Sequence, residues 1–204
     1  MILTHGANSL ERGGGDFVEI GGRKYPVVKI GNQLWIAHNL DWAWEGLVVG
    51  SSTSSSQQRA NYFNNDESTY GWNGRKYGLL YNSPAIAYLD TILSDGWRTA
   101  TSTDWDTLIT NTGSTSKESA DNLRSDDMPW NTPLQGYNIY GMNMLCSGAR
   151  GADGSFITGG NYGDEGYYNG SDYYIYDLYK DGFGPYYDGH PGSQKSVRLV
   201  KDAT

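Results

Sequence analysis

Tyrosine, aspartate and glycine are concentrated in one segment near the C-terminus, residues 161–189. These 29 residues hold nine of the 17 tyrosines of the chain, together with six glycines and five aspartates. Tyrosine gives a binding surface a large, rigid and amphipathic area at low entropy cost, while Gly, Ser and Asn shape loops and adapt hydrogen bonds. The composition therefore favours a ligand-binding surface; the alternative is a twisted sheet with half-buried tyrosines.

The stretch DYYIYDLY, residues 172–179, alternates in the manner of a strand. Ile175 and Asp177 should point to one side, and Tyr176 and Leu178 to the other, so some of its tyrosines must belong to the core. We predict that the tyrosines of the flanking turns are displayed to solvent instead. These are Tyr162, Tyr167, Tyr168, Tyr186 and Tyr187.

The predicted ligand-binding set contains the aromatic and the polar side chains of this segment. It consists of Asn161, Tyr162, Asp164, Tyr167, Tyr168, Asn169, Ser171, Asp172, Tyr173, Tyr174, Tyr176, Asp177, Tyr179, Asp181, Phe183, Tyr186, Tyr187, Asp188 and His190.

Other chemistry-bearing residues form no catalytic or metal-binding pattern. The three histidines lack metal-ligand spacing, and the acidic loops do not match a calcium-binding EF-hand. Cys146 is the single cysteine, which excludes an intrachain disulfide, and it is expected to be a small buried hydrophobe. A carboxylate pair such as Asp172 and Asp177 could be invoked for glycoside hydrolysis, but no feature defines their separation. We predict no enzyme activity, no cofactor and no metal.

Charge and hydropathy exclude two further classes of partner. The net charge of −8 argues against a nucleic-acid partner, which would require a basic face. No apolar run is long enough to insert into a membrane. Residues 1–16 lack the pattern of a secretory signal, so we expect the protein to be made in the cytoplasm without a signal peptide.

Strands and helices must position the tyrosine-rich segment. Alternating stretches at 16–20, 23–30 and 33–40 indicate strands, and 195–202 indicates a final strand. The residues 161–189 lie directly before that last strand, in a β-rich and irregular second half.

Two helices are readable between these strand regions, and a third, shorter one is possible at 117–125. The first begins near Ser83 and Pro84, and the second is capped by Ser102 or Thr103 and stopped by Gly113. Because the helices cluster instead of alternating with strands, the order predicts an α+β fold.

The chain is predicted to be one domain with a short appendage. Residues 1–16 are interpreted as a flexible N-terminal arm or attachment peptide, and residues 17–204 as a ligand-binding domain whose variable region covers about 161–190.

Several segments together resemble the Fibrobacter succinogenes major paralogous domain, a family common in Bacteroidetes and their phages. The segments are YPVVKIGNQLWIAHNL (25–40), RANYFNNDESTYGWNGRKYGLLYNSPAIA (59–87), SDGWRTATSTDWDTL (94–108), LRSDDMPW (123–130) and SVRLVKD (196–202). The resemblance implies a C-type lectin-like fold, with two helices packed on small antiparallel sheets and long irregular loops.

The chain departs from the commoner members in three places. It lacks their lipoprotein signal, it has Ser94-Asp95 where they have a cysteine before the Gly-Trp pair, and DEGYYNGSD replaces their late Trp-Ser-Ser run. The third departure is similar to C-type lectin-like variable proteins of diversity-generating retroelements. In those systems template adenines are randomised, so Asn codons become codons for Tyr, Asp, Ser, Gly, Asn, Phe or His.

This resemblance implies a non-enzymatic phage tail receptor-binding protein, located at the tail tip of the virion. Its Tyr-rich surface would bind a bacterial surface protein or glycan, and it would form a homotrimer attached to tail or baseplate proteins. The lectin calcium motifs are absent, so calcium-dependent sugar binding is not implied. The alternatives are a bacterial surface adhesin or glycan-binding protein of the same fold and, as a third hypothesis, a carbohydrate-active enzyme.

Overall fold

The N-terminal part of the chain forms the antiparallel hairpins that the alternating sequence predicts. In the computed structural model, β1 (Phe17–Ile20) pairs with β2 (Arg23–Ile30), and β2 pairs with β3 (Gln33–Ile36). Gly31 stands in the second turn with a φ of 59°, a conformation that glycine adopts without a Cβ clash. The structure describes residues 16–50, 53–61, 77–126, 136–157, 165–170, 174–179, 181–187 and 190–203.

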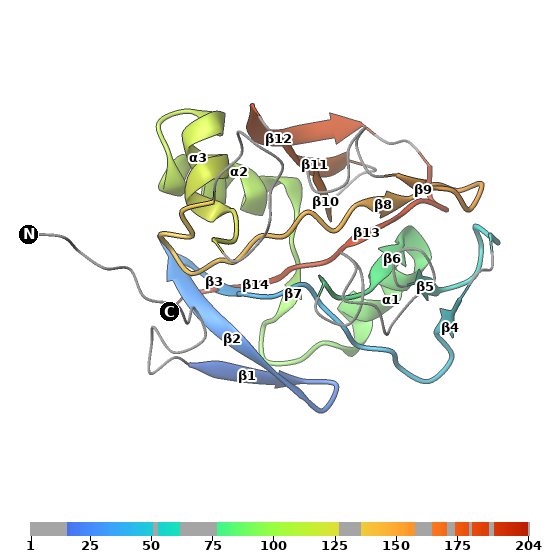
Figure 1. Cartoon of the computed structure of the whole chain (residues 1–204). Helices are drawn as coiled ribbons and strands as arrows, with labels where there is room; N and C mark the ends of the chain where they lie inside the picture. The colour runs from blue at the N-terminus through green and yellow to red at the C-terminus, as the bar shows by residue number, and fades with distance from the viewer. Residues whose placement is uncertain are drawn as a thin grey trace, which may run out of the picture.

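Two strands from distant parts of the chain complete a five-stranded sheet in the order β1-β2-β3-β14-β7. Strand β14 (Leu199–Asp202) lies between β3 and β7 (Arg98–Thr99), with Val200 opposite both Trp35 and Arg98. The predicted C-terminal strand is therefore confirmed, and it lies beside the N-terminal strands (Figure 1).

A second sheet has nine strands among the described residues, seven of them in the order β12-β11-β10-β13-β6-β5-β4, with β8 paired to β13 and β9 to β8. Most neighbours are antiparallel, but β10 runs parallel to β13, and β4 parallel to β5. Its strands are β4 (Val48–Val49), β5 (Arg59–Asn61), β6 (Leu80–Asn82), β8 (Ala149–Arg150), β9 (Phe156–Ile157), β10 (Gly166–Asn169), β11 (Tyr174–Tyr179), β12 (Gly182–Tyr187) and β13 (Gln194–Ser196).

The described residues contain three helices: α1 (Ser83–Ile92), α2 (Ser102–Thr112) and α3 (Ser116–Leu123). All three sequence predictions are confirmed, although α1 is capped by Asn82, just before Ser83, and α2 by Thr101 in place of the predicted Ser102 or Thr103. None of the helices in the described part of the chain is long and apolar enough to span a membrane.

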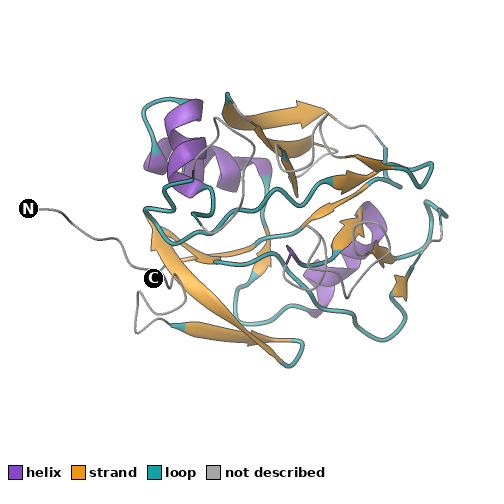
Figure 2. Ribbon diagram, in the orientation of Figure 1, coloured by secondary structure: helices purple, strands orange, loops and turns teal. Residues whose placement is uncertain are grey.

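The predicted fold class is wrong. The prediction was a two-helix α+β arrangement of the C-type lectin type, whereas the described chain is mostly β, with two extended sheets and three short helices (Figure 2). The physical reason is that many strands have only two to four residues and pair with distant segments. Such strands are too short for an alternation pattern, while helices show their apolar stripe locally.

The five-stranded sheet separates two hydrophobic cores. Because successive side chains point to opposite faces, Trp35 and Val200 belong to one core, and Ile36 and Leu199 to the other. The first core also contains α2, α3 and the tyrosine-rich strands, which places the predicted binding segment directly over it.

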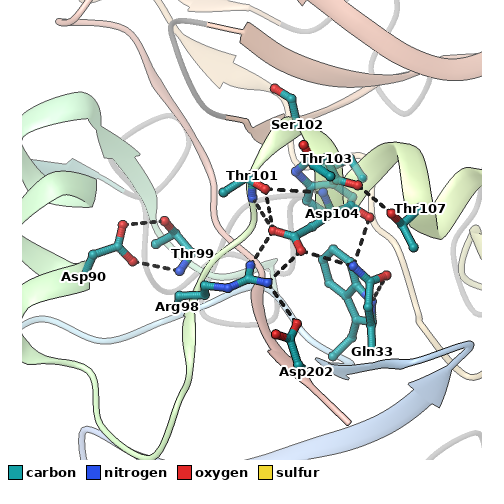
Figure 3. A network of polar contacts seen from close by, with 12 residues as sticks. Gln33, Asp90, Arg98, Thr99, Thr101, Ser102, Thr103, Asp104, Thr107 and Asp202 are labelled. Atoms are coloured by element: carbon teal, nitrogen blue, oxygen red, sulfur yellow. Dashed lines mark hydrogen bonds and ion pairs between the residues drawn. The ribbon is translucent and has the colours of Figure 1, made fainter.

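Asp104 ties α2 to the five-stranded sheet (Figure 3). Its carboxylate accepts hydrogen bonds from the Thr101 backbone N–H at 2.8 Å and hydroxyl at 2.6 Å, which completes a capping box, and from Gln33 Nε2 at 3.1 Å. It also forms an ion pair with Arg98 of β7. Burial alone would raise the pKa of Asp104, but the hydrogen bonds from Arg98 and Thr101 outweigh it and lower the pKa.

Arg198 lies in the chain between β13 of one sheet and β14 of the other, and its side chain is a buried cation with 1% of its surface exposed. Its guanidinium donates to Asn39 Oδ1 at 2.7 Å and to the carbonyl oxygens of Ile36 at 3.0 Å, Met142 at 2.9 Å and Asn143 at 2.7 Å. Burial lowers the pKa of Arg198 to about 10, which still leaves it charged at neutral pH. One cation therefore satisfies acceptors from two separate chain segments, 36–39 and 142–143.

We expect Arg198→Met to lower the free energy of unfolding by about 3 kcal/mol or more, because four buried acceptors lose their donor. The control is Lys117→Met, whose side chain is 59% exposed and whose ion pair with Asp121, four residues on along α3, should contribute about 1 kcal/mol or less. Urea denaturation followed by circular dichroism measures both. A loss no larger for Arg198→Met than for the control would contradict the structural role given to Arg198.

Candidate functional site

Strands β10, β11 and β12 carry most of the described part of the tyrosine-rich segment. They are antiparallel neighbours, with Tyr168 opposite Tyr176, and Ile175 opposite Tyr186. Directly opposite residues share a face, so the first pair lies on one side of the sheet and the second pair on the other. Helices α2 and α3 lie beside these strands (Figure 1).

The inner face of these strands is part of the first core. Tyr168, Tyr176 and Phe183 are at most 1% exposed, and their ring centroids lie 5.6, 5.9 and 5.5 Å from that of Trp105. The Tyr168 hydroxyl donates to the carbonyl of Leu145 at 2.6 Å and accepts from its N–H at 2.8 Å. Burial raises the pKa of Tyr168 to about 12, so this phenol stays neutral.

Polar contacts also hold the inner face to α2. Trp105 Nε1 donates to the carbonyl oxygen of Asn169 at 2.6 Å. The hydroxyl of Tyr176 lies 2.7 Å from Asp106 Oδ1 and 3.0 Å from the carbonyl oxygen of Ser102. These contacts fix the position of β10 and β11, so the outer face of the same strands is a preformed surface.

The outer face lines a cavity of about 330 Å³. Tyr167, Ile175, Asp177 and Tyr186 reach it from β10, β11 and β12. Ile175 is buried, while Tyr186 is 59% exposed. Arg150, Glu165 and Lys195 complete the charged part of its lining. The lining therefore combines aromatic rings with both cationic and anionic groups.

Asp177 is an acidic residue of the cavity lining whose pKa is raised. Its Oδ1 atom is buried and has no hydrogen-bond partner among the described residues. Burial and the negative charge of Glu165 raise the pKa of Asp177 to about 7. Glu165 Oε2 accepts a hydrogen bond from the Tyr167 hydroxyl, and burial together with this bond raises the pKa of Tyr167. A carboxylic acid that has a raised pKa, lines a cavity and has an oxygen without a hydrogen-bond partner is a candidate binding group.

Three of the predicted ligand-binding residues are core residues instead. Tyr168, Tyr176 and Phe183 pack on Trp105 and cannot reach a ligand at the surface. The prediction that Tyr168 stands in a solvated turn is wrong, because Tyr168 lies in β10 and pairs with β11 on one side and β13 on the other. Tyr167, Tyr186 and Tyr187 are likewise strand residues and not turn residues. Tyr167 and Tyr186 lie on the outer face.

The structure brings together Tyr167, Asp177 and Tyr186 from the predicted set. Tyr179 is 37% exposed and Asp181 lies in the turn before β12. Asn169 and the exposed His190, like those two, lie outside the lining of this cavity, and their part in binding stays a prediction.

The remaining predicted residues are not covered by the described structure. For Tyr174 and Tyr187 it describes the strand positions but not the side chains. Those outside the described residues are Asn161, Tyr162, Asp164, Ser171, Asp172, Tyr173 and Asp188.

Six cavity residues were missed by the sequence prediction: Ala149, Arg150, Glu165, Ile175, Ser193 and Lys195. Strand alternation places Ile175 on the side of Asp177, and this signal could have included it. Arg150 and Lys195 come from β8 and β13, which pair only in the tertiary structure, so no local pattern marks them. Within the described ranges, no group of three or more His, Cys, Asp or Glu side chains could hold a metal ion.

One protein family accounts for the sequence over both sheets. The family model of the Fibrobacter succinogenes major domain matches residues 28–201. The chain belongs to this family. Comparison with curated proteins and with solved structures gave no match.

The family predicted from the sequence segments is thus confirmed. In this Fibrobacter succinogenes major domain, the matched region begins in β2 and ends in β14, so it includes the tyrosine-rich strands and the cavity.

We expect Asp177→Asn to stabilise this Fibrobacter succinogenes major domain at alkaline pH. The pKa of Asp177 is higher in the folded chain than in the unfolded chain, so the unfolded chain loses this proton at a lower pH. The free energy of unfolding therefore falls as pH rises from about 4 to about 7. Removing the carboxylate removes this loss. The variant should match wild type near pH 4 and exceed it at about pH 8, by on the order of 1 to 3 kcal/mol.

Urea denaturation at both pH values measures the effect, with the exposed Glu45→Gln as the control. Equal stability of Asp177→Asn and wild type at about pH 8 would show that the carboxylate is not destabilised in the fold.

Proposed function

We propose that this chain is a non-enzymatic ligand-binding protein that uses the outer face of β10, β11 and β12 to bind a receptor on a bacterial surface. The observation that carries the proposal is the division of the tyrosine-rich strands. Their inner rings are anchored in the core, and their outer residues Tyr167, Asp177 and Tyr186 line one cavity.

This arrangement suits binding in two ways. Trp105 and its hydrogen bond to Asn169 hold the strands in place, so less ordering entropy is lost when a ligand binds. Tyr186 and Tyr167 offer large apolar area with a polar end, and tyrosine is enriched among residues that dominate binding energy. Tyr167 is oriented by its bond to Glu165, which leaves its ring to form a wall.

A finer proposal concerns the biological setting. The residue types at 161–190 are close to those produced when adenines of Asn codons are randomised, which supports a diversified phage tail receptor-binding protein. In that setting the chain would be a homotrimer attached to tail or baseplate proteins at the virion tip. Its receptor would be a protein or a glycan of the host surface, and several weak sites would act together.

We expect Tyr167→Ala with Tyr186→Ala to reduce adsorption to host cells at least tenfold, since each ring should contribute about 1 kcal/mol or more. The matched control replaces two exposed tyrosines elsewhere, Tyr137 and Tyr140, by Ala. Adsorption of the labelled chain to a panel of intact Bacteroidetes cells measures binding, and thermal unfolding checks the fold. Unchanged adsorption by the first pair, or equal loss by the control pair, would reject this face as the binding surface.

The diversification proposal predicts a near-copy of the 3′ coding region in the neighbouring DNA, differing only at adenines. Related sequences should vary at positions 167, 177 and 186, while positions 168, 176 and 183 keep large aromatic residues, because these pack on Trp105. Sequencing the flanking DNA and its relatives checks both statements. Differences spread over all four bases would remove the support for a retroelement.

A further inference from the structure

One carboxylate oxygen of the cavity lining has no hydrogen-bond partner among the described residues. Asp177 and Glu165 both line it, and Glu165 is the charged group that acts on the Asp177 carboxyl within the described chain. Asp177 Oδ1 is buried and accepts no hydrogen bond from the described residues. A buried, unpaired acceptor carries a desolvation cost that a donor from a ligand would remove.

The other walls suit an alkyl chain that ends in a cation. The rings of Tyr167 and Tyr186 line the cavity on two strands, and aromatic faces attract ammonium groups. Ile175 and Ala149 are buried apolar residues of the lining, and they can contact methylene groups. A cavity of about 330 Å³ is large enough for one extended side chain.

We propose that this cavity binds the ammonium group of a lysine side chain presented by a receptor protein. The inference rests on the proposed function and specifies the chemistry of its site. The ammonium would donate to Asp177 Oδ1 and lie between the charges of Asp177 and Glu165, which removes their mutual repulsion. Its stem would lie along Ile175 and the tyrosine rings.

The two cations of the lining do not replace the ligand. Arg150 is 3% exposed; its Nε donates to the carbonyl of Gly154 at 3.2 Å, and its guanidinium carbon lies 5.6 Å from the ring centroid of Phe156. Lys195 is also 3% exposed, in β13. Neither contributes to the pKa of Asp177, which responds to burial and to Glu165.

The binding of the ammonium should depend on pH. A lysine ammonium stays charged below about pH 10, whereas Asp177 ionises near neutral pH, so affinity should rise between about pH 6 and pH 8. A bound cation favours the ionised carboxylate and therefore lowers the pKa of Asp177. The titratable groups that share the cavity with Asp177 are Glu165, Tyr167, Tyr186, Arg150 and Lys195.

The test titrates the full chain with N-acetyl-lysine methylamide and follows backbone amide signals by NMR. The comparison ligand is N-acetyl-norleucine methylamide, which has the same alkyl length without the ammonium. We expect the lysine probe to bind at least tenfold more tightly than the norleucine probe at about pH 8, and more weakly at about pH 6. Asp177→Asn should weaken it at least tenfold, and the variant is expected to stay folded because it loses a destabilising charge.

Three results would overturn the inference: equal affinity for the two probes, unchanged affinity in Asp177→Asn, or tighter binding of glucosamine or N-acetyl-arginine methylamide than of the lysine probe. The adsorption assay separates this failure from failure of the proposed function. If the lysine probe does not bind but the Tyr167 and Tyr186 double variant loses adsorption, the ligand chemistry is wrong and the binding face stands. If that variant adsorbs normally, the proposed function itself fails.

Discussion

The packing of Trp105 against the tyrosine-rich strands is the interaction on which the proposed binding face depends. Its indole contacts Trp35 of the five-stranded sheet at 4.8 Å between centroids, and it also packs on Tyr168, Tyr176 and Phe183. The same ring donates a hydrogen bond to β10. The neighbouring residue Asp104 caps α2 and pairs with Arg98 of β7, which holds the start of the helix on the five-stranded sheet. The position of this indole is therefore set by contacts with both sheets. The inner face of the strands is therefore held in place by ring packing and a hydrogen bond.

Buried charge is handled differently in the structural and in the candidate functional part of the molecule. Arg198 has four oxygen acceptors, and Asp104 has donors from α2, β3 and β7, so both ions are compensated by the fold. Asp177 receives no such compensation from the described residues, and the charge of Glu165 adds repulsion. The ionised Asp177 carboxylate destabilises the fold, and a ligand that donates a hydrogen bond to it would remove part of this cost.

The division of the tyrosines gives one segment both a core face and a cavity face. Residues of β10, β11 and β12 alternate between core and cavity, so neighbouring tyrosines such as Tyr167 and Tyr168 have opposite roles. Substitutions on the outer face change the lining of the cavity and leave the packing on Trp105 intact. Substitutions on the inner face create voids in a close-packed core and destabilise the fold. Diversity is therefore tolerated on one side of these strands only.

The sequence by itself determined the helices, the N-terminal hairpins, the last strand and the family, because helix caps, apolar stripes and strand alternation are local patterns, and the family segments are contiguous. It also marked the segment that contains Tyr167, Asp177 and Tyr186. Only the tertiary structure decided the mostly β fold and buried Tyr168, Tyr176 and Phe183. It alone brought Arg150 and Lys195 to the cavity. Pairing between distant short strands settles these features, and no local pattern encodes which distant backbone a short strand will meet.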